Sequence, residues 1–150
     1  GEVKKDAKLH IGYYSQEFET FDFNKTILEA IEEKCHLPMN QILPILAKFN
    51  FSRHRIQQTI GTLSGGEKTR LAIALLMLQN YNLLILDEPT TYLDVISQKT
   101  ILEALKSYKG AMLFVSHTPE FVEGLTPNRV MYLPENTIKH WLPTDEENYV

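Results

Sequence analysis

Two short runs of consecutive apolar residues dominate the hydrophobic pattern of the chain, at residues 83–86 (LLIL) and 111–115 (AMLFV). Residues 97–106 lie between them with a helical pattern. Apolar strands separated by a helix indicate a parallel sheet that helices cover on both faces. A third strand is predicted over residues 8–15, where apolar and polar residues alternate loosely. The fold class predicted is therefore α/β, with a parallel sheet flanked by helices.

The region from about residue 23 to residue 60 has a different pattern and predicts a helical insert without a strand. Apolar residues at helical spacing (Ile27, Leu28 and Ile31) favour a helix over residues 26–34, and a second helix is expected over residues 39–49 with Pro44 disturbing its middle. A long helix over residues 65–79 follows the insert; it is apolar nearly all round and should be buried. Residues 129–133 and 137–141 flank a Pro134-Glu135-Asn136 turn and predict a hairpin.

Composition and charge exclude several classes of protein. The 150 residues fit one domain, and 43% hydrophobic with 23% charged residues is ordinary for a globular protein. A formal net charge of −4 argues against a chain held on nucleic acid by its overall charge. The longest apolar run, residues 71–78, is far shorter than the ~20 residues that cross a bilayer. The single cysteine, Cys35, fits a reducing compartment, so we expect a cytoplasmic protein without direct membrane insertion.

The stretch LSGGE at residues 63–67 opens the long helix with two glycines, each costing ~1 kcal/mol relative to alanine in a helix. Ser64 and Glu67 have the spacing of a capping box, which explains both without a ligand. That interpretation leaves Gly65 and Gly66 unexplained. Bare backbone N–H groups at a helix start form an anion site, and glycines let a phosphate approach them closely. The sequence leaves both interpretations open.

Two adjacent carboxylates, Asp87 and Glu88, follow the first apolar run directly, and Pro89 ends the strand. One carboxylate can hold Mg²⁺ together with phosphate oxygens, and the other can activate a water molecule. The alternative is that both acids are merely solvated at a strand end. His117 follows the second apolar run, and parallel strands would bring it to the same sheet edge. A lone histidine is more often a packed or surface residue.

Together these stretches carry a family resemblance. LSGGE, LLILDEP, TTYLD and FVSH resemble the signature, Walker B, D-loop and switch-histidine motifs of ABC-type ATPases, in the family's order, and Gln16 resembles the Q-loop glutamine. GGEKTRL and LKSYKGAMLFVSH are most similar to the ABC-F subfamily. Its members are twin-domain ATPases without membrane spans; many act on the ribosome, and some protect it from antibiotics. Thr91-Tyr92 and Thr118-Pro119 depart from the family pattern, which usually has Asn-His and Asp-Arg at these places.

The resemblance implies a partial P-loop NTPase domain with ATP and Mg²⁺ as its cofactors and a second ABC ATPase domain as its partner. It implies a core region at residues 1–22 with the first strand and Q-loop, a helical subdomain at 23–62, the remaining core at 63–141 and a tail at 142–150. In this arrangement two domains sandwich two ATP molecules. The resemblance implies a role for each motif residue. Asp87 would bind Mg²⁺, Glu88 would activate the attacking water, and His117 would contact the γ-phosphate. Gln16 would sense Mg²⁺ or the water. Ser64, Gly65 and Gly66 would contact the partner's ATP, and Asp94 would bridge the two domains.

A phosphate-binding loop of the form Gly-x-x-x-x-Gly-Lys-Ser/Thr occurs nowhere, and none of the seven glycines precedes a lysine. We therefore expect this chain to be the C-terminal part of a nucleotide-binding domain, inactive by itself and prone to self-association through exposed apolar surface. Three other hypotheses remain: the ATPase subunit of a transporter with a membrane permease, a chromosome-maintenance ATPase, and a degenerate domain kept as an interaction module.

Overall fold

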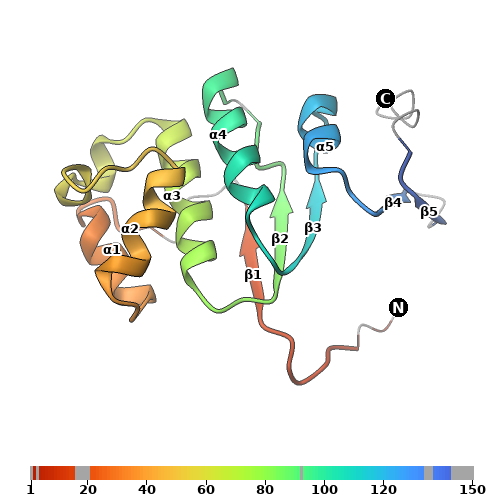
Figure 1. Cartoon of the computed structure of the whole chain (residues 1–150), viewed down its shortest axis with the longest axis horizontal. Coiled ribbons are helices and arrows are strands. Elements are labelled where there is room, and N and C mark those ends of the chain that lie inside the picture. Colours follow the sequence, from red (N-terminus) through yellow and green to blue (C-terminus); the bar gives the residue numbers. More distant parts are fainter. Residues whose placement is uncertain (1, 3, 16–20, 92, 134–136, 143–150) are drawn as a thin grey trace.

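The computed structural model describes residues 2, 4–15, 21–91, 93–133 and 137–142 (Figure 1). Helices and strands alternate along the second half of the chain, whereas the first half is mostly helical. In chain order the elements are β1 (Ile11–Tyr14), α1 (Ile27–Lys34), α2 (Met39–Lys48), the 3₁₀ turns η2 (Arg55–Gln57) and η3 (Ile60–Thr62), α3 (Gly65–Leu78), β2 (Leu83–Asp87), α4 (Val95–Lys106), β3 (Ala111–Val115), α5 (Pro119–Leu125), β4 (Arg129–Tyr132) and β5 (Thr137–His140).

The main sheet has the strand order β1-β2-β3, and both strand pairs are parallel. Its register places Tyr13 opposite Ile85 and Ile85 opposite Leu113, so these three side chains form one row across the sheet. The prediction of a parallel sheet is confirmed, and all three carboxyl ends lie at the same edge (Figure 1).

Helices cover only one face of this sheet in the part of the chain that the structure describes. On the covered face Leu84 and Leu86 are fully buried and Phe114 meets Phe121 of α5 edge to face, with ring centroids 6.1 Å apart. On the other face Tyr13 and Leu113 are 58% and 55% exposed. The expectation of helices on both faces is therefore wrong for these residues. The apolar runs place apolar side chains on both faces of the sheet, but helices α3, α4 and α5 all pack against the same face.

The region between β1 and α3 is helical as predicted, with one isolated antiparallel bridge between Thr26 and Thr59. Thr26 and Glu29 form a capping box at the start of α1. Helix α2 continues across Pro44. The missing Pro44 N–H would have bonded the carbonyl of Asn40, one turn earlier. Because both residues are exposed, water can bond that carbonyl, and the proline is tolerated without breaking the helix.

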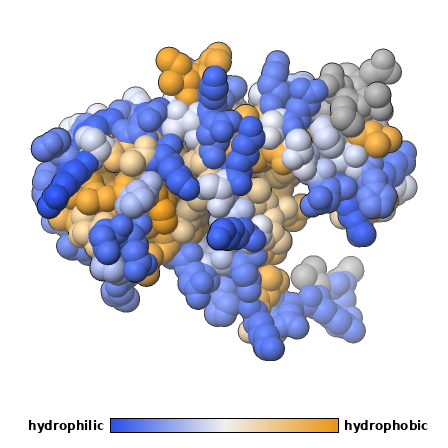
Figure 2. All heavy atoms as spheres, viewed as in Figure 1, coloured by the Kyte–Doolittle hydropathy of each residue, from blue (hydrophilic) through white to orange (hydrophobic). Residues whose placement is uncertain are grey.

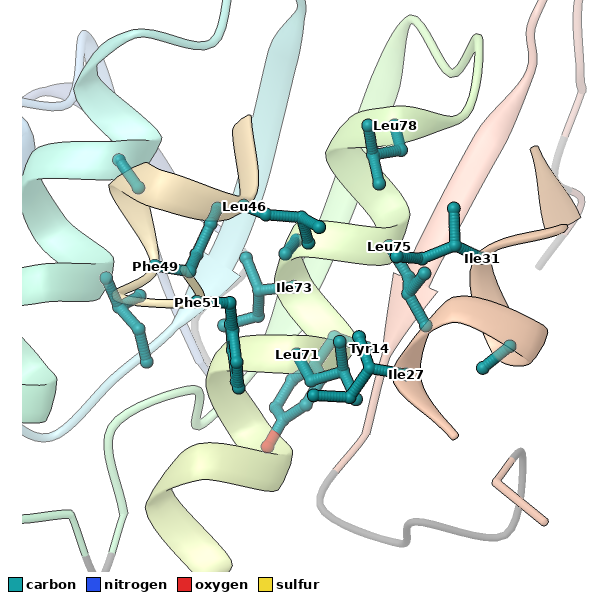
Figure 3. Close-up of a cluster of buried hydrophobic side chains, with 14 of the residues drawn as sticks. Tyr14, Ile27, Ile31, Leu46, Phe49, Phe51, Leu71, Ile73, Leu75 and Leu78 are labelled. Atoms are coloured by element: carbon teal, nitrogen blue, oxygen red, sulfur yellow. The ribbon is translucent and has the colours of Figure 1, made fainter. Parts of the chain in front are cut away.

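Helix α3 is the centre of the hydrophobic core (Figure 3). Its side chains Leu71, Ile73, Leu75 and Leu78 are at most 3% exposed. Figure 3 shows them between residues of the flanking elements, which are Tyr14 of β1, Ile27 and Ile31 of α1, and Leu46 with Phe49 and Phe51 around the end of α2. Each fully buried side chain of this size contributes ~1.5–3 kcal/mol. The helix is largely buried, as predicted, although Ala72, Leu76 and Met77 are only half-buried, and this packing holds the first turn of α3 in position.

The C-terminal part contains the predicted hairpin, because β4 pairs with β5 antiparallel. The predicted turn at Pro134-Glu135-Asn136 lies outside the described residues. In the described ranges, no helix combines the length and apolar character that crossing a membrane would require.

Candidate functional site

The first turn of α3 is held by a capping box. The Ser64 hydroxyl accepts a hydrogen bond from the Glu67 backbone N–H at 3.3 Å, and the Glu67 carboxylate accepts one from the Ser64 N–H at 2.9 Å. Arg55 of η2 adds a hydrogen bond to Glu67 Oε1 at 2.7 Å. The Ser64 N–H and then Arg55 hold the pKa of Glu67 below its ordinary value. The capping interpretation of Ser64 and Glu67 is thus confirmed.

The two glycines of this turn have different surroundings. A Cβ atom added to Gly65 would meet nothing within 4 Å and would point into open space. A Cβ atom at Gly66 would lie 3.2 Å from Ser97 Oγ and 3.6 Å from Asp94 Oδ2. Gly66 therefore has a packing role against the start of α4, which the sequence did not indicate. Gly65 has no such role, and its exposed backbone is open to an approaching group.

The end of β2 presents the two acidic residues. Asp87 is its last residue, pairs with Val115 of β3 and is exposed. Glu88 follows with φ of 47°, a left-handed conformation that costs a non-glycine residue ~1–2 kcal/mol. Its backbone N–H still donates to the Val115 carbonyl at 3.0 Å. The turn therefore leaves the strand at Glu88 while β3 holds the backbone in place.

The Glu88 carboxylate lies between a threonine and a histidine. Thr91 Oγ1 donates to Glu88 Oε2 at 3.1 Å, and His117 Nε2 lies 3.3 Å from Oε1. Oε1 is shielded from solvent and has no hydrogen-bond partner among the described residues, since the His117 contact has the distance of an ion pair without hydrogen-bond alignment. His117 itself is 81% exposed. The structure thus brings Glu88 and His117 together at one edge of the sheet, with Oε1 unpaired among the described residues.

A pair of threonines joins the two turns that carry these residues. Thr90, which is buried, shares a hydrogen bond of 3.1 Å with Thr118, and the Thr118 N–H donates to Ser116 Oγ at 3.1 Å. Both turns are therefore tied together next to the Glu88–His117 contact. Sequence reasoning did not find this pair, because no local pattern links two threonines 28 positions apart.

Asp94 begins α4 as its N-cap. Its Oδ1 accepts from the Ser97 N–H at 2.9 Å, and its Oδ2 accepts from the Ser97 hydroxyl at 2.7 Å. These two bonds, the hydroxyl first, lower the pKa of Asp94. The helix was predicted from residue 97, and the Asp-x-x-Ser spacing was the signal that could have moved its start to Val95. Val95 and Ile96 are exposed, and Figure 2 shows apolar residues at this end of α4.

The described residues contain no cluster of three or more potential metal ligands among His, Cys, Asp and Glu. Gln16, predicted to contact Mg²⁺, lies outside the described residues. Mg²⁺ is commonly bound by one or two carboxylates together with waters and substrate phosphates. The single exposed carboxylate of Asp87 at the end of β2 fits that mode of binding.

A sequence profile of the ABC transporter family matches residues 2–91. The chain therefore belongs to this family. It is 39% identical over 143 residues to the protein YdiF of Bacillus subtilis, covering 95% of this chain and 22% of YdiF. It is 38% identical over 128 residues to the ATP-binding protein Uup of Escherichia coli, covering 82% of this chain and 20% of Uup. It is 36% identical to the ABC transporter F family member 2 of Arabidopsis thaliana, covering 79% of this chain and 18% of that protein.

These relatives confirm the resemblance to ABC-type ATPases of the ABC-F kind, and this chain spans about a fifth of their length. Among solved structures, the dimeric ATP-binding cassette MJ0796 bound to ADP and Pi is similar with a TM-score of 0.69 and 23% identity, covering 88% of this chain and 63% of that one. This similarity confirms the predicted fold class of a P-loop NTPase of the ABC type.

Proposed function

We propose that this domain hydrolyses ATP together with a second ATPase domain. The observation that carries the proposal is the contact between Glu88 and His117 beyond the carboxyl ends of β2 and β3, with Glu88 Oε1 shielded and unpaired. A carboxylate in that state can accept a proton from a water molecule. Ligands of open parallel sheets bind at this edge, which agrees with the position of the pair.

The acidic residues and the histidine have separate roles in this proposal. Asp87 and Gln16 would hold Mg²⁺, which when bound would supply neutralisation of the charge on the phosphates. Glu88 orients and deprotonates the attacking water, while Thr91 fixes its other carboxylate oxygen. His117, largely exposed, donates to the γ-phosphate. Phosphoryl transfer requires mainly positioning and charge neutralisation, which these groups supply.

The start of α3 acts on the ATP that the partner domain holds. Gly65 leaves the turn open to a phosphate, and the bare N–H groups of the helix start favour an anion. Ser64 adds a hydroxyl, Gly66 keeps the turn close to α4, and Asp94 bridges the two domains. The exposed apolar residues at the start of α4 support a protein contact there.

The remaining assignments concern the whole protein. Residues 1–22 and 63–141 form the ATPase core, residues 23–62 a helical subdomain and residues 142–150 a tail. The family's phosphate-binding loop is absent from this chain, so the chain alone binds ATP weakly and is inactive. The similarity to an ABC transporter F family member supports the ABC-F kind of ATPase, and the proposed action of the whole protein in the cytoplasm, on the ribosome and in antibiotic resistance follows from that resemblance.

A cavity in the helical insert favours a second candidate, an ATPase subunit bound to a membrane permease. It has a volume of about 390 Å³ and is lined by Met39, Leu43, Arg53, His54, Ile56 and Gln57. A permease segment that presents both apolar and polar side chains would fit a cavity with this mixed lining. Cosedimentation of the full-length protein with ribosomes supports the first candidate, and copurification with a detergent-solubilised permease supports the second.

The variant Glu88→Gln in the full-length protein tests the proposed activity. We expect its ATP turnover to fall by about 10²–10⁴-fold, which is the contribution of a general base. The matched control is Glu103→Gln, which changes an exposed glutamate of α4 that pairs with Lys106. ATP-driven association of the two domains should persist in both variants. Turnover at the wild-type rate in Glu88→Gln would refute the assignment.

A further inference from the structure

A buried arginine connects the first turn of α3 with the start of α4. Arg70 Nη1 donates to Ser97 Oγ at 2.9 Å, and that hydroxyl donates to Asp94 Oδ2 at 2.7 Å. On the other side, Arg70 Nη2 lies 4.0 Å from Glu67 Oε1, within the capping box of Ser64. We call Arg70, Ser97 and Asp94 the bridge. It joins two helix starts that lie about thirty residues apart in the sequence.

Gly66, in the backbone of the first turn of α3, also packs close to Ser97 of the bridge. A Cβ atom there would lie 3.2 Å from Ser97 Oγ, so the gap between the α3 backbone and the bridge is too small for an added side chain unless Ser97 shifts. Ser97 is 2% exposed, and water has little access to its hydroxyl. A displacement of the Ser64–Gly66 turn toward α4 therefore meets Ser97, whose hydroxyl is bonded to Asp94.

The energetics of Arg70 argue against a role in packing alone. The residue is 9% exposed, and its Nε–H is buried without a hydrogen-bond partner among the described residues. An unpaired buried donor destabilises the folded state. An apolar residue of similar volume is often at least as stable as a buried charge. What an apolar residue cannot supply is the hydrogen bond to Ser97 and the positive charge close to Glu67.

We propose that Arg70 is a positioning residue that makes the Ser64–Gly66 turn and the Asp94 turn move as one unit. This inference rests on the proposed function, in which the first turn contacts the partner's ATP and Asp94 meets the partner domain. Under that function, nucleotide bound at one turn orders the other turn of the same chain. Asp94 lies six residues beyond Glu88, so the unit is also continuous in sequence with the proposed hydrolytic residue.

Amide hydrogen exchange in the full-length protein without nucleotide tests the bridge itself. Three amides occupy the same position, four residues after the N-cap, in three helices: Lys68 bonds to Ser64, Gln98 bonds to Asp94, and Ala30 bonds to Thr26 in α1. Losing one hydrogen bond shifts a local opening equilibrium by about fivefold. We expect Ser97→Ala to speed exchange by about fivefold at both Lys68 and Gln98, with Ala30 unchanged.

Two further variants separate the bridge from local effects. Arg70→Met keeps most of the buried stem and should speed exchange at the same two amides. Ser107→Ala, at the far end of α4, removes a hydroxyl that bonds Ala104 and Lys48 and should change neither. The inference is overturned if Ser97→Ala affects only Gln98 while Arg70→Met affects only Lys68, since each residue would then support its own helix alone.

The second arm adds Mg²⁺ and a nonhydrolysable ATP analogue to the same full-length proteins. In the wild type we expect slower exchange at both Lys68 and Gln98. In Ser97→Ala we expect nucleotide to slow Lys68 as in the wild type but Gln98 less than in the wild type, because Asp94 then keeps only its own contact with the partner domain. Slowing at Gln98 in Ser97→Ala as large as in the wild type contradicts the inference. If nucleotide slows neither amide in the wild type, the proposed contact with ATP fails, while the first arm still decides whether the bridge couples the two turns.

Discussion

Alanine substitutions at Gly65 and Gly66 separate the two reasons for which a glycine can occupy a helix start. Both residues lie in the first turn of α3, where alanine is the better helix former by up to ~1 kcal/mol. At Gly65 an added methyl group meets no atom within 4 Å. We therefore expect Gly65→Ala to raise the free energy of unfolding by about 0.4–1 kcal/mol.

At Gly66 an alanine substitution would place its methyl group against the bridge. The added Cβ lies 3.2 Å from Ser97 Oγ and 3.5 Å from Leu93 Cδ2, so Ser97 has to shift by a few tenths of an ångström. Because its hydroxyl is bonded to both Arg70 and Asp94, that shift strains two hydrogen bonds. Overpacking costs ~1–3 kcal/mol, which exceeds the gain in helix propensity. We expect Gly66→Ala to lower the free energy of unfolding.

The assay combines chemical unfolding with steady-state ATP turnover of the full-length protein. Gly65→Ala should lose turnover by tenfold or more, about 1.4 kcal/mol of transition-state stabilisation, although it is more stable than the wild type. Its methyl group occupies the space through which a phosphate reaches the N–H groups. Wild-type turnover in a stabilised Gly65→Ala protein would refute the phosphate-approach argument, and a destabilised Gly65→Ala protein would refute the structural one.

Three further predictions concern other parts of the chain. Thr91→Val should reduce ATP turnover about fivefold without changing thermal stability, because it removes the 3.1 Å bond to the Glu88 carboxylate; an unchanged rate would contradict this. The hydrogen bond from the Ser64 N–H lowers the pKa of Glu67 in the folded protein. This bond therefore stabilises the folded state fully at a pH above 4.5, the ordinary pKa of glutamate. The stabilisation is lost as the pH falls through the lowered pKa of the folded state. In Glu67→Gln, unfolding curves should depend less on pH in that acid range, and an unchanged dependence would exclude the bond as its cause. Leu113→Lys, on the uncovered sheet face, should reduce self-association of the 150-residue chain in light scattering, and equal association would place the contact elsewhere.

Short-range patterns in the sequence predicted most of the elements but missed the short helix α5 (Pro119–Leu125). The apolar runs became β2 and β3, and the nearly all-apolar segment became the buried helix α3. The Ser64–Glu67 spacing gave a capping box because both partners lie within one helical turn, where geometry is fixed by the backbone.

Features that depend on tertiary contacts were not predictable in this way. The role of Gly66 against Ser97, the bridge through Arg70 and the Thr90–Thr118 bond each join residues 27 to 31 positions apart. The uncovered sheet face was also missed. An apolar strand sequence indicates only that its side chains favour burial. Which face of the sheet is covered depends on the helices that pack against it.

The left-handed backbone of Glu88 was equally hidden, since glutamate rarely adopts that conformation. The sequence placed Glu88 at a strand end and His117 after the next strand. The fold then supplied the turn that aims the carboxylate at the imidazole, with Oε1 and Nε2 3.3 Å apart.

The most direct test of the whole account is a structure of the full-length protein with Mg²⁺ and a nonhydrolysable ATP analogue. The account predicts that the Gly65 N–H and the Ser64 hydroxyl lie within hydrogen-bond distance, about 2.7–3.2 Å, of a γ-phosphate oxygen held by the second ATPase domain. Glu88 and His117 should face the γ-phosphate on their own side. A structure in which the Ser64–Gly66 turn faces bulk solvent while nucleotide is bound would contradict it.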